Sequence, residues 1–273
     1  DPEEIPVDAV QSSSLAISKI KSAFEEAERV ISALETKGYI ETYIKCNRTL
    51  DIIESARFNA KKFREDIKSG KVKNVSVAKT FKVDNNGYLQ KTKYSTSKTI
   101  TGRMTVNSGP QILTAPKYYR KYIDSAYDGG KIFQLDFVSL EPRVGIHTKK
   151  PESERDIYSF LMRNIFSEKI PRSLMKKIVL CSMYGASEAT IREEIPKGYS
   201  PKRVIEKTRE YLNFKNVVLA QKENIREFGF IKNYFGRPIY PQDSRDAIIF
   251  NNYIQSSAVD ISLLGFKKIL DRV

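Results

Sequence analysis

The sequence predicts an α+β protein, because stretches with helical spacing are interrupted by stretches in which apolar and polar residues alternate. Near the N-terminus, apolar residues such as Ile20 and Phe24 recur at helical intervals. Residues 75–94 alternate around an Asn-Gly pair, which favours a β-hairpin. Residues 131–137 (KIFQLDF) alternate again before another helical stretch. Helices and antiparallel strands are therefore expected within one chain.

Two helices are expected at the start of the chain. The serines at positions 12–14 can cap the first helix, which would end before Gly38. A second helical stretch runs from about Ile40 to Lys68, just before Gly70, and cations near its end suit the negative end of a helix dipole. We expect these two helices to pair as an antiparallel arm.

The segment 131–137 is expected to be a strand that ends beside an acidic group. Its alternation places Asp136 on the same face as Ile132. Ser139 can then cap a helix in which Pro142 falls within the first turn, where a missing N–H is least costly. A strand, a carboxylate, a tight turn and a helix would follow one another.

Residues 171–185 (PRSLMKKIVLCSMYG) carry the pattern that is most informative about function. Between its first Pro and last Gly, Arg172, Lys176, Leu180 and Tyr184 recur every four residues. At a rise of about 1.5 Å per residue, these side chains follow one face of a helix. Two cations one turn apart can grip different phosphates of a triphosphate, and the tyrosine offers a ring for base stacking. Solvated helix faces also carry such spacing.

The charge balance favours a polyanionic partner. The chain has 47 Lys plus Arg against 33 Asp plus Glu, a formal net charge of +14. Nucleic acid is the first candidate. Basic residues lie among hydroxyl groups in residues 91–98 (KTKYSTSK) and among tyrosines in residues 117–122 (KYYRKY), although solvated surfaces carry such groups too.

Cysteine usage and hydropathy limit the alternatives. Cys46 and Cys181 lack the spacing of a zinc site or of a disulfide framework, so we expect a reducing compartment. No apolar run reaches transmembrane length, and the acidic start is not a signal peptide. A soluble cytoplasmic protein without a membrane partner is expected.

Motifs that follow one another along the chain resemble those of family A DNA polymerases, the bacterial DNA polymerase I-like enzymes. Residues 136–147 (DFVSLEPRVGIH) are similar to the first acidic motif of the family, and residues 172–185 to its nucleotide-binding fingers helix. Residues 101–104 (TGRM) resemble the Thr-Gly-Arg before the palm strand, and residues 234–241 (YFGRPIYP) the Gly-Arg loop after the fingers. Residues 251–261 (NNYIQSSAVDI) resemble the helix that faces the primer-template.

This resemblance implies a right-hand polymerase architecture. It places a helical thumb region at residues 1–74, the first part of the palm with its catalytic strand at 75–155, the fingers at 156–234 and the second part of the palm at 235–273. The implied activity is template-directed, magnesium-dependent transfer of deoxynucleotides to a primer 3′-hydroxyl, with release of pyrophosphate. A lean core rich in Lys, Asn and Ile favours a phage or plasmid replication enzyme.

The resemblance also implies roles for individual residues. Asp136, with the backbone carbonyl of Phe137, would ligate two Mg²⁺ ions. Arg172 would hold the γ-phosphate, while Lys176 would neutralise the α-phosphate and protonate the leaving pyrophosphate. Glu141 would lie against the sugar and exclude a 2′-hydroxyl.

Further contacts with nucleotide and DNA are implied by the same motifs. The implied nucleotide contacts are Glu141, Tyr158, Arg172, Lys176, Leu180 and Tyr184. The implied primer-template contacts are Arg103, Tyr184, Arg237, Asn251 and Gln255. Tyr158 stands where many members have His, and Leu180 where the family usually has Phe or Tyr. His147 would support the first acidic motif, whereas Asp260 and Asp271 match no role and are expected at the surface.

Two alternatives and one expected gap accompany this interpretation. Single-subunit phage-type RNA polymerases share the cations, Tyr and Gly of the fingers helix, although Glu141 and the Thr-Gly-Arg favour a DNA enzyme. A catalytically inactive nucleic-acid-binding fragment is the other alternative. In the family, a second catalytic Asp lies in a His-Asp-Glu hairpin, which is not found up to Val273. We therefore expect residues 1–273 alone to bind DNA and deoxynucleoside triphosphates with negligible polymerase activity, the missing Asp coming from a downstream segment or a companion chain.

Overall fold

The computed structural model describes residues 13–35, 38–73, 75–146 and 156–272. Helices dominate this part of the chain, and its strands form three separate two-stranded antiparallel sheets, as the α+β prediction requires. The paired strands are β1 (Arg57–Phe58) with β4 (Ile123–Asp124), β2 (Lys93–Ser95) with β3 (Thr105–Ser108), and β5 (Ile231–Lys232) with β6 (Pro238–Ile239). No helix in the described ranges is long and apolar enough to cross a membrane.

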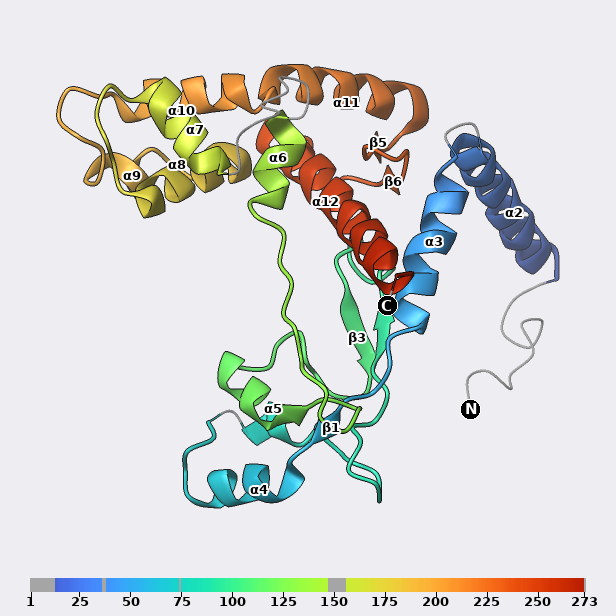
Figure 1. Cartoon of the computed structure of the whole chain (residues 1–273). Helices are drawn as coiled ribbons and strands as arrows, with labels where there is room; N and C mark the ends of the chain where they lie inside the picture. Colours follow the sequence, from blue (N-terminus) through green and yellow to red (C-terminus); the bar gives the residue numbers. More distant parts are fainter. Residues whose placement is uncertain (1–12, 36–37, 74, 147–155, 273) are drawn as a thin grey trace.

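The N-terminal helices differ in one respect from the prediction. Helix α2 (Ser13–Glu35) lies beside α3 (Tyr39–Asp51) in Figure 1, but α3 stops well before Lys68. The expected second helix is interrupted by β1, and a separate α4 (Ala60–Lys68) follows. The reason is local capping together with tertiary pairing: the Asn59 side chain accepts a hydrogen bond from the N–H of Lys62, and β1 pairs with β4.

An aromatic cluster holds together the unit at the bottom of Figure 1. Its elements are β1, α4, α5 (Val75–Ala78), the 3₁₀ helix η1 (Lys117–Tyr122) and β4. The Phe63 ring meets the Tyr122 ring edge-on at 4.9 Å between centroids. Tyr122 also donates a hydrogen bond of 2.6 Å to Asp66, whose carboxylate pairs with Lys121 at 3.0 Å and with Lys71 at 3.7 Å. The cluster draws on residues before and after residue 74, and the predicted domain limits stay a prediction.

The predicted hairpin at residues 75–94 is correct only at its turn. The chain reverses at Asn85–Gly87, where Gly87 has a φ of 82° and the Asp84 side chain accepts from two following N–H groups. Only an isolated bridge, Val83 to Leu89, joins the two arms, and the first arm begins with α5. The second arm instead leads to β2, which takes β3 as its partner.

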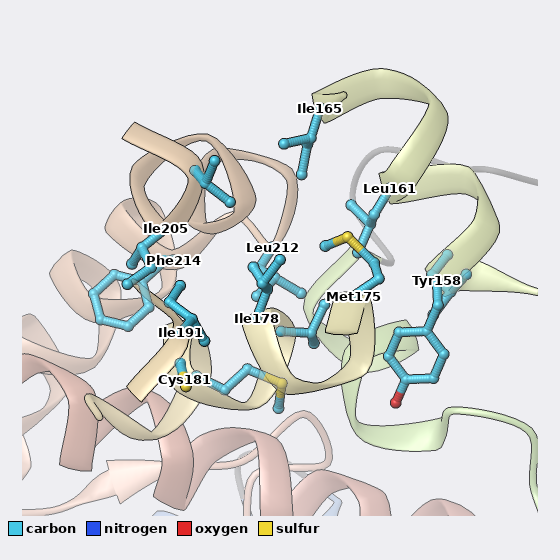
Figure 2. Close-up of a cluster of buried hydrophobic side chains, with 14 of the residues drawn as sticks. Tyr158, Leu161, Ile165, Met175, Ile178, Cys181, Ile191, Ile205, Leu212 and Phe214 are labelled. Carbon is cyan, nitrogen blue, oxygen red and sulfur yellow. The ribbon is translucent and has the colours of Figure 1, made fainter. Parts of the chain in front are cut away.

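The largest hydrophobic core lies among helices α7 to α11, on the upper left of Figure 1 and enlarged in Figure 2. These helices are α7 (Ile157–Ile165), α8 (Arg172–Tyr184), α9 (Ala189–Arg192), α10 (Pro201–Tyr211) and α11 (Phe214–Phe228). The predicted helix between Pro171 and Gly185 is confirmed as α8. Gly185 ends it with a φ of 74°, and a Cβ there would lie 2.7 Å from the side chain of Ala247.

Helix α12 (Asp246–Leu270) runs through the middle of the molecule and contacts α3, α8, α11 and β5, as well as α6 (Leu140–Ile146). Because neighbours surround it, polar as well as apolar side chains on this helix are buried. Asp260 is one of them, with only 1% of its surface exposed, so the expectation of a surface residue is wrong. Asp271, in contrast, is exposed and pairs with Lys267 at 2.7 Å.

The predicted strand at residues 131–137 is not a strand, because it has no ladder partner among the described residues. It rises as a single extended connection to α6 in Figure 1, and Phe133 is 80% exposed. Two of its side chains are held: Gln134 accepts a hydrogen bond from Nη1 of Arg120, and the Phe137 ring packs edge-on against Phe266, where a Cβ at Gly265 would lie 2.7 Å from that ring. Alternation predicted the direction of the backbone but could not supply a neighbouring strand.

Candidate functional site

Residues from well-separated segments meet in an open cavity of about 600 Å³. Its walls come from α6, α7, α8 and α12, from the end of the extended segment, and from the loop before β3. The predicted residues that line it are Arg103, Asp136, Phe137, Glu141, Tyr158, Arg172, Lys176, Leu180 and Gln255. The structure therefore brings most of the predicted site together, while the roles of these residues stay predictions.

Helix α8 presents its cationic face to the cavity because its other face is buried. Met175, Ile178 and Val179 are inaccessible to solvent within the core, part of which Figure 2 shows. The four-residue spacing then directs Arg172 and Lys176 together toward the opposite side. Lys176 is exposed and has no ion-pair partner among the described residues, so its ammonium group is available to an anion.

Arg172 is already held by a carboxylate. Its Nε and Nη2 donate hydrogen bonds of 2.9 Å each to the two oxygens of Asp156, directly before α7. Its guanidinium carbon also lies 4.8 Å from the centre of the Tyr158 ring. The hydrogen bonds from Arg172 lower the pKa of Asp156 to about 2, so the carboxylate is ionised at neutral pH. Sequence reasoning missed Asp156, because nothing local shows which cation it will meet.

Glu141 and Tyr184 form a second polar contact at the edge of the cavity. The Tyr184 hydroxyl donates to Oε2 of Glu141, and Nη2 of Arg103 lies 3.9 Å from Oε1. Burial raises the pKa of Tyr184, and the hydrogen bond to the carboxylate adds to the rise. Tyr184 therefore stays a neutral donor at physiological pH and fixes the Glu141 side chain toward the cavity.

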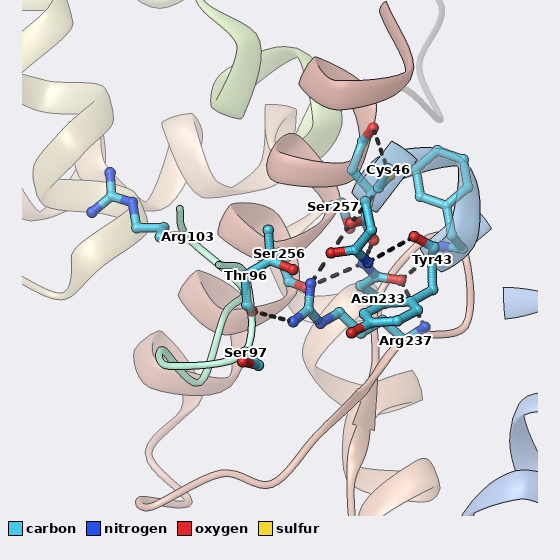
Figure 3. A network of polar contacts seen from close by, with 12 residues as sticks. Tyr43, Cys46, Thr96, Ser97, Arg103, Asn233, Arg237, Ser256 and Ser257 are labelled. Atoms are coloured by element: carbon cyan, nitrogen blue, oxygen red, sulfur yellow. Dashed lines mark hydrogen bonds and ion pairs between the residues drawn. The ribbon is translucent and has the colours of Figure 1, made fainter. Parts of the chain in front are cut away.

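Three predicted residues lie outside this arrangement. Arg237 has its guanidinium inside the protein, where Nη2 donates to the carbonyl of Thr96 at 2.8 Å (Figure 3). Asn251 does not line the cavity, and its side-chain oxygen is buried without a hydrogen-bond partner among the described residues. DNA contact by either residue stays a prediction. His147 lies outside the described residues.

Arg237 belongs to a buried polar network that joins α12 to two loops (Figure 3). Its Nη1 lies 3.7 Å from Oδ1 of Asp260, whose Oδ2 accepts a 2.7 Å hydrogen bond from Asn233. Burial raises the pKa of Asp260, while the contacts with Asn233 and Arg237 oppose that rise. A Cβ at Gly102 would lie 2.0 Å from Nη1 of Arg237, so the glycine admits the guanidinium beside the loop that carries Arg103.

The donor set does not make a complete site for two magnesium ions. Such a site needs carboxylates from more than one place. Among residues 13–35, 38–73, 75–146 and 156–272, no group of three or more His, Cys, Asp or Glu is placed to hold a metal ion. At the cavity, Asp136 is an exposed carboxylate, whereas Glu141 is already engaged by Tyr184. Magnesium binding therefore stays a prediction that requires a further carboxylate.

Comparison with solved structures shows the fold of a DNA polymerase domain. A similar structure is the POL domain of Pol1 from M. smegmatis, solved in complex with DNA primer-template and dNTP, with a TM-score of 0.52 and 18% sequence identity. The match covers 72% of this chain and 40% of that one, so this chain spans less than half of the matched polymerase chain. No protein-family model matches the sequence. No curated protein matches it either.

Proposed function

We propose that this chain is part of a template-directed DNA polymerase that transfers deoxynucleotides to a primer 3′-hydroxyl and releases pyrophosphate. The observation that carries the proposal is the single cavity that Arg172, Lys176, Asp136 and Glu141 line together, within a polymerase-domain fold. A right-hand architecture follows from the proposal. Its fingers would be α7 to α11, its palm would include α6, α12 and the residues around Asp136, and its thumb would begin with α2 and α3.

The cations of α8 account for the handling of the triphosphate. Arg172 and Lys176 lie one turn apart, so each can neutralise a different phosphate group. In the transfer step the primer 3′-hydroxyl loses its proton to solvent, its oxygen bonds to the α-phosphorus, and the bond from that phosphorus to the bridging oxygen breaks. Lys176 gives its proton to the departing pyrophosphate oxygen, which stabilises the leaving group, and takes up a proton from solvent afterwards. Asp136 and the Phe137 carbonyl are the proposed ligands of two magnesium ions.

Glu141 is the proposed discriminator between deoxyribose and ribose. Tyr184 and Arg103 hold its carboxylate at the cavity, where a 2′-hydroxyl would meet a fixed acidic side chain. This position favours the DNA polymerase over the RNA polymerase alternative, because the restraint acts on the sugar and not on the base.

Primer extension with magnesium, carried out with the natural chain that contains residues 1–273, tests the proposed function. We expect deoxynucleotides to be incorporated in preference to ribonucleotides, and Glu141→Ala to raise ribonucleotide use relative to the unchanged chain because it removes the restraint on the sugar. A preference for ribonucleotides in the unchanged chain would establish the RNA polymerase alternative. DNA and nucleotide binding without any incorporation would contradict polymerase activity of that chain by itself, leaving the inactive fragment or a catalytic Asp from a companion chain.

Primer-template affinity should depend steeply on salt, because the net charge of +14 points to phosphate contacts as the main source of binding. If six or more phosphates are neutralised, the affinity should fall by roughly 10³–10⁵-fold between about 50 and 200 mM salt. Fluorescence anisotropy of a labelled primer-template across that range measures the slope. Binding that is insensitive to salt would argue against DNA as the partner.

A further inference from the structure

Among the residues that the structure describes, Asp156 is the one charged group that contacts a cavity cation without a role in the function proposed above. We propose that Asp156 is a positioning residue for the triphosphate. Its carboxylate holds one edge of the Arg172 guanidinium, so that the opposite edge faces the incoming phosphates. This inference rests on the proposed function, since it assigns a partner to the nucleotide-binding arginine. Asp156 itself need not touch the nucleotide.

The hydrogen-bond geometry leaves Arg172 with spare donors. A guanidinium carries five N–H groups in a planar fork. Asp156 takes the Nε–H and one N–H of Nη2, each at 2.9 Å, so both N–H groups of Nη1 and the second one of Nη2 are not used by the carboxylate. Because the two hydrogen bonds are parallel, they fix the plane of the fork as well as its distance.

A second contact restrains the same group from another direction. The guanidinium carbon of Arg172 lies over the Tyr158 ring, 4.8 Å from its centre, and both residues line the cavity. Arg172 is thus held along one edge by the Asp156 carboxylate and also contacts the Tyr158 ring. The edge that remains is the one a phosphate in the cavity can reach.

Asp156 is fixed in its turn. The Ser159 hydroxyl donates a 2.6 Å hydrogen bond to Oδ2, the oxygen that also accepts from Nε of Arg172. Asp156 and Ser159 are one helical turn apart at the start of α7, so the carboxylate is oriented by the helix from which it projects. The chain of contacts therefore runs from α7 through Asp156 to the guanidinium of α8.

The ion pair between Asp156 and Arg172 is explained better by orientation of the arginine than by a contribution to the stability of the fold. The Arg172 side chain is 54% exposed and that of Asp156 28%, and exposed ion pairs contribute little to folding. An arginine that is already ordered loses less side-chain freedom when it binds a phosphate. The opposing effect is repulsion between Asp156 and the triphosphate, which is weakened because Arg172 neutralises the carboxylate directly. We therefore expect removal of Asp156 to weaken triphosphate binding by roughly five- to tenfold.

Titration of nucleotides into residues 1–273 and its variants by calorimetry tests the proposal. Asp156→Ala should weaken deoxynucleoside triphosphate binding by roughly five- to tenfold and leave monophosphate binding unchanged, because Arg172 acts on the terminal phosphate. Asp156→Asn keeps one acceptor and the side-chain shape, so its loss should be smaller. Inorganic tripolyphosphate should show the same order among the variants. The matched control is Glu194→Gln. It removes the ion pair between Glu194 and Lys177, a residue of α8 that, unlike Arg172, does not line the cavity.

The results of these titrations support or contradict the positioning role of Asp156. Equal losses for triphosphate and monophosphate in both Asp156 variants would make Asp156 a structural residue of α7. Unchanged or tighter triphosphate binding would show that it does not position Arg172. Failure of the unchanged chain to bind any triphosphate would overturn this inference. If triphosphate binding follows the expected order but the natural chain shows no primer extension, the positioning role stands and polymerase activity of that chain by itself falls.

Discussion

Lys176→Ala is expected to slow single-turnover nucleotide incorporation by roughly 10²–10⁴-fold, the range for loss of a general acid. Primer-template affinity should stay nearly unchanged, since the side chain lines the cavity proposed to bind the nucleotide. Lys177→Ala is the matched control: Lys177 is the next residue of α8, carries the same charge, pairs with Glu194 and does not line the cavity. Rapid-quench measurements on the natural chain with magnesium, under saturating nucleotide, isolate the chemical step.

A similar small effect from both lysine variants would contradict the assignment of Lys176 and return it to an ordinary solvated helix face. A large loss of DNA affinity in Lys176→Ala would instead make it a DNA contact. The comparison is informative because the two side chains differ in direction and not in helix propensity or charge.

Asp260→Ala is expected to lower the free energy of unfolding by about 3–5 kcal/mol, the range for breaking a buried ion pair on one side only. The change leaves the Arg237 guanidinium buried without its carboxylate and removes the 2.7 Å acceptor of Asn233. Urea unfolding of residues 1–273, followed by circular dichroism, measures the difference. Asp271→Ala, which breaks an exposed pair with Lys267, should change the unfolding free energy by about 1 kcal/mol or less.

Removal of both charges separates the ion pair from simple loss of packing. In Asp260→Leu combined with Arg237→Met, no unpaired charge remains, so the double variant should be more stable than Asp260→Ala. Equal stability of the two variants would mean that the buried charge of Arg237 is not what destabilises the single variant. An Asp260→Ala protein as stable as Asp271→Ala would contradict the structural role of the network.

Features that depend on neighbouring residues in the sequence could be predicted, whereas features that depend on contacts between distant segments could not. Helix α8 was predictable, because Pro171 and Gly185 mark its ends and a four-residue repeat marks its cavity face. The Asn-Gly turn before Tyr88 was predictable for the same local reason. Asp260 was misjudged, because a carboxylate is usually exposed and only the fold brings Asn233 and Arg237 to it.

The remaining errors concern partners that the sequence does not encode locally. Alternation at residues 131–137 describes an extended backbone equally well with or without a neighbour, so the expected strand was not formed. The pairing of β1 with β4 joins segments far apart in the chain, and it divided a stretch whose local pattern reads as one helix. The partnership of Asp156 with Arg172 depends on how α7 packs against α8.

The exposed segment 131–137 also bears on how the protein behaves at high concentration. An extended backbone without a ladder partner among the described residues, flanked by the outward-facing side chains of Ile132, Phe133 and Leu135, can pair edge to edge with another molecule. Mutual repulsion between molecules with a net charge of +14 opposes that pairing. Added salt shortens the reach of this repulsion to about 3 Å at 1 M. Concentrated salt is therefore expected to favour self-association through this segment.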